Sequence, residues 1–191
     1  GYFKDAYKYH MRSLDIRLEL NDEWGIGQSY CYLGFYHKLI GEYEIAIGYF
    51  KKSVEIFYRI GDLQQLAAAV SGIAQSNVYL SNYDDSIKYG HQYHEYSLKL
   101  NNPVDKGCSF FYIFISYIEL GDFEKAKKYG FEAFNIASND KNDYFMCQYG
   151  IMIGKLFTET GEYEDAIKYL EKCKSLHENN KLFLRIIIIA L

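Results

Sequence analysis

The stretch Gly41-Glu42-Tyr43-Glu44-Ile45-Ala46 decides the fold, because related hexapeptides begin every 40 residues along the chain. The other four begin at Gly1, Ser81, Gly121 and Gly161. Every copy has an aromatic residue at its third position, a small residue (Ala or Ser) at its sixth and a tyrosine at its ninth. Several matching columns in one register indicate an internal repeat, which has to be recognised before any other feature of the fold is considered.

The spacing inside each copy is helical. Recurring positions step by three or four residues, so they share one face of a helix. A second apolar stripe precedes each turn and includes Leu33, Ile73, Ile113 and Ile153. Glycine at the start of most copies supplies the positive φ that ends a helix. Each 40-residue copy therefore predicts two helices of roughly 16–18 residues joined by tight turns.

A two-helix unit cannot bury its apolar face alone, and stacked copies form a continuous core. We therefore predict an all-α fold: an α-solenoid, coiled as a right-handed superhelix of antiparallel helix pairs, with about ten helices. One solenoid is expected over residues 1–191, with repeat turns at Gly1, Gly41, Ser81, Gly121 and Gly161. The tenth helix is expected to begin at about Lys181 and to be truncated.

Composition narrows the function classes. The chain has 191 residues, one proline and a formal net charge of −4, and 18% of its residues are aromatic. A single proline suits a nearly all-helical chain, and the acidic balance argues against nucleic acid as a partner. No signal peptide is evident, and the longest apolar run, 182–191, is too short to span a bilayer. The four cysteines have no zinc-site spacing, so we expect reduced thiols in a cytoplasmic protein with no membrane partner.

The two ends of the sequence suggest a piece of a longer protein. The chain begins without Met and stops inside the apolar segment that ends at Leu191. Solenoids need polar end caps. An uncapped C-terminal helix predicts either more protein beyond Leu191 or a homo-oligomer formed through that helix.

The repeat resembles the tetratricopeptide repeat (TPR). The resemblance is carried by Leu33-Gly34, by Gly41-Glu42-Tyr43, and by Ala46, Tyr49-Phe50 and Ser53. The period of 40 exceeds the usual 34, and Phe114 stands where other copies have Gly34 or Gly154, which predicts locally wider helix packing. Long-helix repeats of this kind look like those of bacterial peptide-sensing regulators and of cell-polarity scaffolds. The resemblance implies recognition of a protein or peptide.

By the same resemblance, the first helix of each pair would line a concave groove. The residues expected there are Gln28, Cys31, Phe35, Lys38, Ser71, Gln75, Tyr79, Phe111, Ile115, Glu119, Ile151 and Lys155. Cys31 and Phe35 occupy positions where chaperone-docking repeats have carboxylate-binding residues, so a two-carboxylate clamp is not expected. Two interpretations stay open: a ligand groove with apolar anchors, or packing in which residues such as Phe111 and Ile115 fill a tightly curved array.

The sequence contains no nucleotide-binding or hydrolase motif. His91, His94 and Glu95 lie within one helical turn, but a solvated helix face explains them better than a metal site. We therefore expect a non-enzymatic chain without metal or cofactor. The leading hypothesis is a protein- or peptide-binding module, a sensory or scaffolding segment of a bacterial signalling protein. The alternatives are a structural spacer or dimerisation unit, and a regulatory array that controls an attached enzyme domain.

Overall fold

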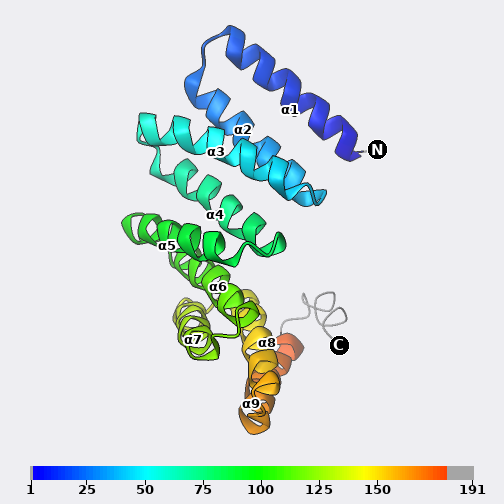
Figure 1. Cartoon of the computed structure of the whole chain (residues 1–191), viewed down its shortest axis with the longest axis vertical. Helices are drawn as coiled ribbons and strands as arrows, with labels where there is room; N and C mark the ends of the chain where they lie inside the picture. Colours follow the sequence, from blue (N-terminus) through cyan, green and yellow to red (C-terminus); the bar gives the residue numbers. More distant parts are fainter. Residues whose placement is uncertain (1, 180–191) are drawn as a thin grey trace. The chain divides into compact units, whose positions relative to one another are not determined.

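The computed structural model describes residues 2–179 (Figure 1). In that range every regular element is an α-helix. The chain divides into two compact units, Gly1–Asn102 and Pro103–Leu191. Unit 1 holds α1 to α5, and unit 2 holds α6 to α9. The helices are α1 (Tyr2–Glu19), α2 (Glu23–Leu39), α3 (Tyr43–Ile60), α4 (Leu63–Tyr79), α5 (Tyr83–Lys99), α6 (Pro103–Glu119), α7 (Phe123–Asn139), α8 (Asp143–Glu159) and α9 (Tyr163–Asn179).

Within each unit, helices that follow one another in the chain pack side by side, as the repeat predicts. The pairs are α2 with α3 and α4 with α5 in unit 1, and α6 with α7 and α8 with α9 in unit 2. The predicted all-α fold of sequential antiparallel pairs is confirmed. The single solenoid over 1–191 and its right-handed coil stay predictions. The turn at Gly1 and the helix expected from Lys181 lie outside the described residues.

Every connection between helices is built on one residue with positive φ. The described glycines of this kind are Gly41, Gly61, Gly121 and Gly161, with φ of 74–82°. The residue after each turn donates its backbone N–H to the carbonyl five positions earlier, as Glu42 does to His37 at 2.9 Å. This is the Schellman arrangement that satisfies the last carbonyls of a helix. The turns predicted at 41, 81, 121 and 161 are confirmed.

Four of these turns carry a residue other than glycine. Asn21, Ser81, Asn101 and Lys141 have φ of 50–59°. Asparagine tolerates this left-handed region, whereas a serine or lysine adopts it at a cost in backbone energy. The turns between α1 and α9 therefore recur every 20 residues, and glycine marks four of the eight.

The core of unit 1 is organised around the Phe50 ring on α3, which is fully buried. Two glycines leave room for it. A Cβ atom at Gly34 of α2 would lie 2.6 Å from Phe50 Cε1, and one at Gly72 of α4 would lie 2.4 Å from Cζ. Because real Cβ contacts are never this short, the ring fits only while both neighbouring helices present glycine to it.

In unit 2 the large and the small residue at this helix contact have changed places. Phe114 on α6 is fully buried and stands at the position of Gly34. The facing residue on α7 is Gly130, where a Cβ atom would lie 3.0 Å from the Phe114 ring. The large residue at 114, which suggested wider packing, is thus accommodated by a small one on the facing helix.

No helix in residues 2–179 combines the length and apolar character needed to cross a bilayer. The four cysteines are free, and Cys147 and Cys173 lie against each other at the α8–α9 crossing. Each thiol lies 3.6 Å from the other residue's carbonyl oxygen, which gives both buried sulfurs a polar contact.

Candidate functional site

The expected groove of unit 1 lies on the faces of α2 and α4, which pack against each other. Here the structure brings together Phe35, Lys38 and Gln75. The Lys38 ammonium donates a hydrogen bond to Gln75 Oε1 and lies 4.9 Å from the centre of the Phe35 ring. Phe35 in turn packs edge-on against Phe50 at 5.0 Å between ring centres. The three side chains therefore form one connected cluster anchored in the core of unit 1.

The positive charge of this cluster is carried by the half-buried ammonium of Lys38. Burial lowers the pKa of Lys38, and the nearby Cys31 thiol only partly offsets this effect. The same burial raises the pKa of Cys31 to about 11, so that thiol is neutral at pH 7. Glu42, four residues after Lys38, points to His37 instead, with Oε2 2.6 Å from Nδ1. Within the described residues, no carboxylate oxygen lies within 4.0 Å of the Lys38 ammonium.

The other predicted residues of unit 1 have different surroundings. Cys31 is only 2% exposed, so it lies beneath the surface that it was expected to line. Gln28 accepts a hydrogen bond from Arg17 at 3.2 Å, and Ser71 donates to the carbonyl of Ala68 in its own helix at 2.8 Å. Tyr79 is 56% exposed and stacks on Tyr43 at 4.9 Å. Tyr79 is therefore the accessible aromatic group at the end of α4.

In unit 2 the expected groove residues lie on α6 and α8. Phe111 packs on Tyr149 at 4.7 Å between ring centres and contributes to the core, while part of it stays exposed. Ile115 and Ile151 are also partly exposed, and Glu119 is exposed. Lys155 is paired with Glu159 at 3.7 Å on its own helix. This face combines apolar surface with a charged pair, and Phe111 serves packing as well as surface.

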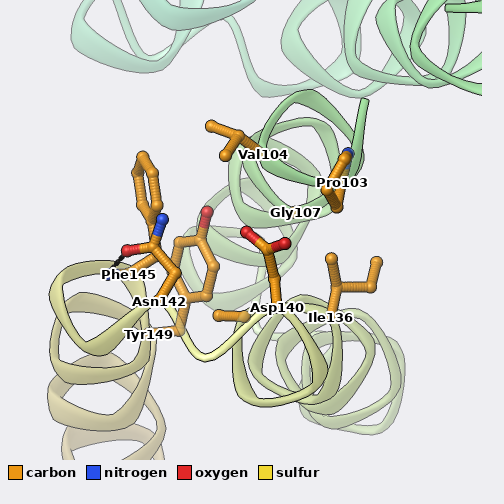
Figure 2. Close-up of a pocket in the computed structure, with 9 residues that line it drawn as sticks. Pro103, Val104, Gly107, Ile136, Asp140, Asn142, Phe145 and Tyr149 are labelled. Carbon is orange, nitrogen blue, oxygen red and sulfur yellow. Dashed lines mark hydrogen bonds between the residues drawn. The ribbon is translucent and has the colours of Figure 1, made fainter. Parts of the chain in front are cut away.

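Sequence analysis missed one small cavity in unit 2 (Figure 2). It lies where the N-termini of α6 and α8 meet the C-terminal end of α7. Pro103, Gly107, Phe145 and Tyr149 are among its lining residues, and Asn142 caps α8 beside it by accepting the N–H of Phe145. Its water-accessible volume is about 10 Å³, which is about the space of one water molecule. The cavity therefore suits a bound water better than an organic ligand.

The structure has no candidate metal site in residues 2–179. No three His, Cys, Asp or Glu side chains gather there as a metal would require, so His91, His94 and Glu95 do not form such a group.

Comparison with known proteins gives a match to a repeat family over part of the chain, and a fold. The model of the tetratricopeptide repeat matches residues 151–180. No curated protein matches the chain in sequence. Among solved structures, BtubC (BKLC) from P. vanneervenii superposes with a TM-score of 0.84 at 16% identity, over 96% of this chain and 76% of that one.

Two further structures are similar. Aspartyl phosphate phosphatase F from Bacillus subtilis gives a TM-score of 0.85 at 14% identity, over 93% of this chain and 46% of that chain. A Rap protein complexed with competence and sporulation factor gives 0.72 at 11% identity, over 94% and 56%. This chain spans about half of each of these two proteins. At such identities the likeness shows the fold alone.

Proposed function

We propose that this chain, a tetratricopeptide-repeat protein, is a non-catalytic module that binds a protein or peptide through the faces of its first helices. In this proposal it serves as a sensory or scaffolding segment of a bacterial signalling protein. The observation that carries the proposal is the cluster of Phe35, Lys38 and Gln75 on α2 and α4. It presents an aromatic ring, a cation and an amide side by side on a preformed surface, which suits recognition of a peptide.

Two further observations support binding at this face. Leu39 and Tyr79 are 67% and 56% exposed at the ends of α2 and α4, so apolar contact surface continues beyond the cluster. The Rap protein, which shares the fold, was solved in complex with a factor. A rigid helical scaffold with exposed apolar anchors reduces the entropy that a ligand loses on binding, because the protein surface needs no ordering.

Selection from a displayed peptide library tests the proposal. The whole chain is used as bait, and the affinity of an enriched peptide is then measured for Phe35→Ala, Tyr79→Ala and Phe111→Ala. The control is Tyr58→Ala, because Tyr58 is 74% exposed on α3, a second helix of its pair. We expect weaker binding by about tenfold or more for at least one groove variant and no change for the control. Equal affinity across all four variants, each with unchanged circular dichroism, would contradict the groove assignment.

A second candidate is a regulatory array attached to an enzyme domain. The likeness to aspartyl phosphate phosphatase F supports it, because this chain spans 46% of that protein. The full-length gene product discriminates the two candidates: a catalytic domain next to these repeats, with activity that changes when the selected peptide binds, would favour the regulatory array.

A further inference from the structure

We propose that Lys38, with Phe35 and Gln75, forms a subsite in unit 1 that binds the side-chain carboxylate of an acidic residue within a peptide. The inference deepens the proposed binding function and rests on it. It assigns a chemical class to one position of the ligand, which neither the repeat nor the comparisons supply.

The first step is that the ammonium is held in place. Lys38 projects from α2 toward α4, where Gln75 Oε1 accepts one of its hydrogen bonds, and the Phe35 ring lies against it at 4.9 Å. Phe35 is fixed by its contact with the buried ring of Phe50. A lysine side chain normally loses much rotamer entropy when it binds a ligand. Here part of that entropy is already lost in the free protein, so a carboxylate meets a positioned cation.

The second step is that this cation lacks an acidic partner among the described residues. A half-buried charge paired only with neutral groups has lost water without gaining a counter-ion. Glu42 stands four residues along and could have paired with it, but Glu42 contacts His37. An incoming carboxylate would replace the lost hydration with a charge-assisted hydrogen bond.

Unit 2 provides the contrast at equivalent positions of the repeat. Ile118, which is buried, stands where Lys38 stands, and Lys155 stands where Gln75 stands. The Lys155 ammonium has Glu159 at 3.7 Å on its own helix. The lysine of unit 2 is thus paired within the chain, whereas that of unit 1 is available to a ligand, so we expect acidic selectivity at unit 1 alone.

A single carboxylate fits the subsite better than a phosphate. Lys38 has three N–H donors, and Gln75 takes one of them, which leaves two for an anion. A phosphate carries nearly two negative charges and is normally held by several cationic or backbone donors. Exposed apolar side chains, Leu39 and Tyr79, lie at the helix ends beyond Lys38, and Gln28 lies on the other side along α2. Because surface continues on both sides, we assign the carboxylate to a residue inside the bound peptide rather than to its C-terminus.

The test uses the whole chain and peptides enriched from the displayed library. Each peptide is made with its acidic residue as Glu or Gln, and with a free or amidated C-terminus. Affinities are measured by fluorescence anisotropy at low and high salt for wild type, Lys38→Met, Lys38→Arg and the control Lys51→Met, which changes an exposed lysine of α3 outside the groove. Methionine keeps much of the apolar stem and removes the charge, and arginine restores the charge.

We expect wild type to prefer the Glu peptide over the Gln peptide by about tenfold at low salt, and less at high salt. Lys38→Met should abolish that preference, Lys38→Arg should restore part of it, and Lys51→Met and amidation should leave it intact. A preference that survives Lys38→Met, or enriched peptides that lack an acidic residue but still depend on Phe35, would overturn the subsite and leave the groove standing. Loss of binding on amidation would assign the carboxylate to the C-terminus and overturn the proposal. Failure of every peptide to bind would overturn the proposed function as well.

Discussion

The glycine contacts of Phe50 predict opposite effects for two alanine substitutions of the same chemical type. Gly72 lies in α4, and an added Cβ atom would come within 2.4, 2.6 and 2.7 Å of three Phe50 ring atoms. Gly48 lies in α3, and a Cβ atom there would meet nothing within 4 Å. Each substitution gains about 1 kcal/mol of helix propensity. At Gly72, overpacking against a buried ring costs about 1–3 kcal/mol, and three such short contacts place it at the upper end.

We therefore expect Gly72→Ala to lower the free energy of unfolding by about 1–2 kcal/mol and Gly48→Ala to raise it by up to about 1 kcal/mol. Urea unfolding followed by circular dichroism measures both. With a slope of about 2–3 kcal/mol per molar urea for a chain of this size, the midpoint falls by about 0.5 M for Gly72→Ala. Adding Phe50→Leu to Gly72→Ala should cost less than Phe50→Leu alone, because the smaller side chain relieves the clash. Equal midpoints for the two alanine variants would refute the packing argument.

Three other changes have expected outcomes. Lys141→Gly should raise the thermal midpoint by an amount corresponding to about 1 kcal/mol, because Lys141 has φ of 52° and glycine adopts that region without strain; an unchanged midpoint would argue against strain there. Asp62 accepts hydrogen bonds from the backbone N–H of Gln65 and from Trp24 Nε1, so Asp62→Ala should lower the free energy of unfolding by about 1 kcal/mol and change the fluorescence emission of Trp24. Asp62→Asn keeps a capping oxygen and should lower the free energy of unfolding by less. Hydrogen bonds from Lys127 and Thr160 hold the pKa of Glu162 below its ordinary value of 4.5, so the stability that Glu162 contributes is present above that pH and is lost as pH falls through the folded pKa. Glu162→Gln should therefore make the free energy of unfolding less dependent on pH in the acid range, and the same pH dependence in wild type and variant would contradict the pairing.

The turns show how far sequence reasoning reaches. Gly41, Gly121 and Gly161 could be placed from sequence because positive φ favours glycine, and Asn102 before Pro103 could be placed because proline suits the first turn of a helix. Lys141 gave no such signal. Its left-handed conformation belongs to the same hydrogen-bonded turn that ends the other helices, in which Asn142 donates its backbone N–H to the carbonyl of Ala137 at 2.9 Å, and lysine itself does not favour that conformation.

The candidate site shows where sequence reasoning stops. The spacing of residues from each turn placed Phe35, Lys38 and Gln75 on one face. It could not predict that Gln75 accepts a hydrogen bond from Lys38, or that Glu42 contacts His37. Those contacts depend on rotamers and on the distance between α2 and α4. Cys31 was expected at the surface and is buried, because the same helix face is covered more deeply there than at Lys38.

Unit 2 gives the same lesson for packing. The size of Phe114 alone suggested wider helix spacing, since nothing in a single column of the repeat reveals what faces it. The compensation comes from Gly130, which lies on the partner helix and in a different column. Helix spacing therefore depends on the two repeat positions that face each other across a helix crossing, and neither position predicts it alone.

Hydrogen exchange of the chain, with and without a library-selected peptide, tests the central claim most directly. The claim is that ligands bind the face formed by the first helices of each pair. The account predicts slower exchange on binding in α2 and α4, or in α6 and α8, with little change in the second helices α3 and α7. Protection confined to α3, α5, α7 or α9 would contradict it.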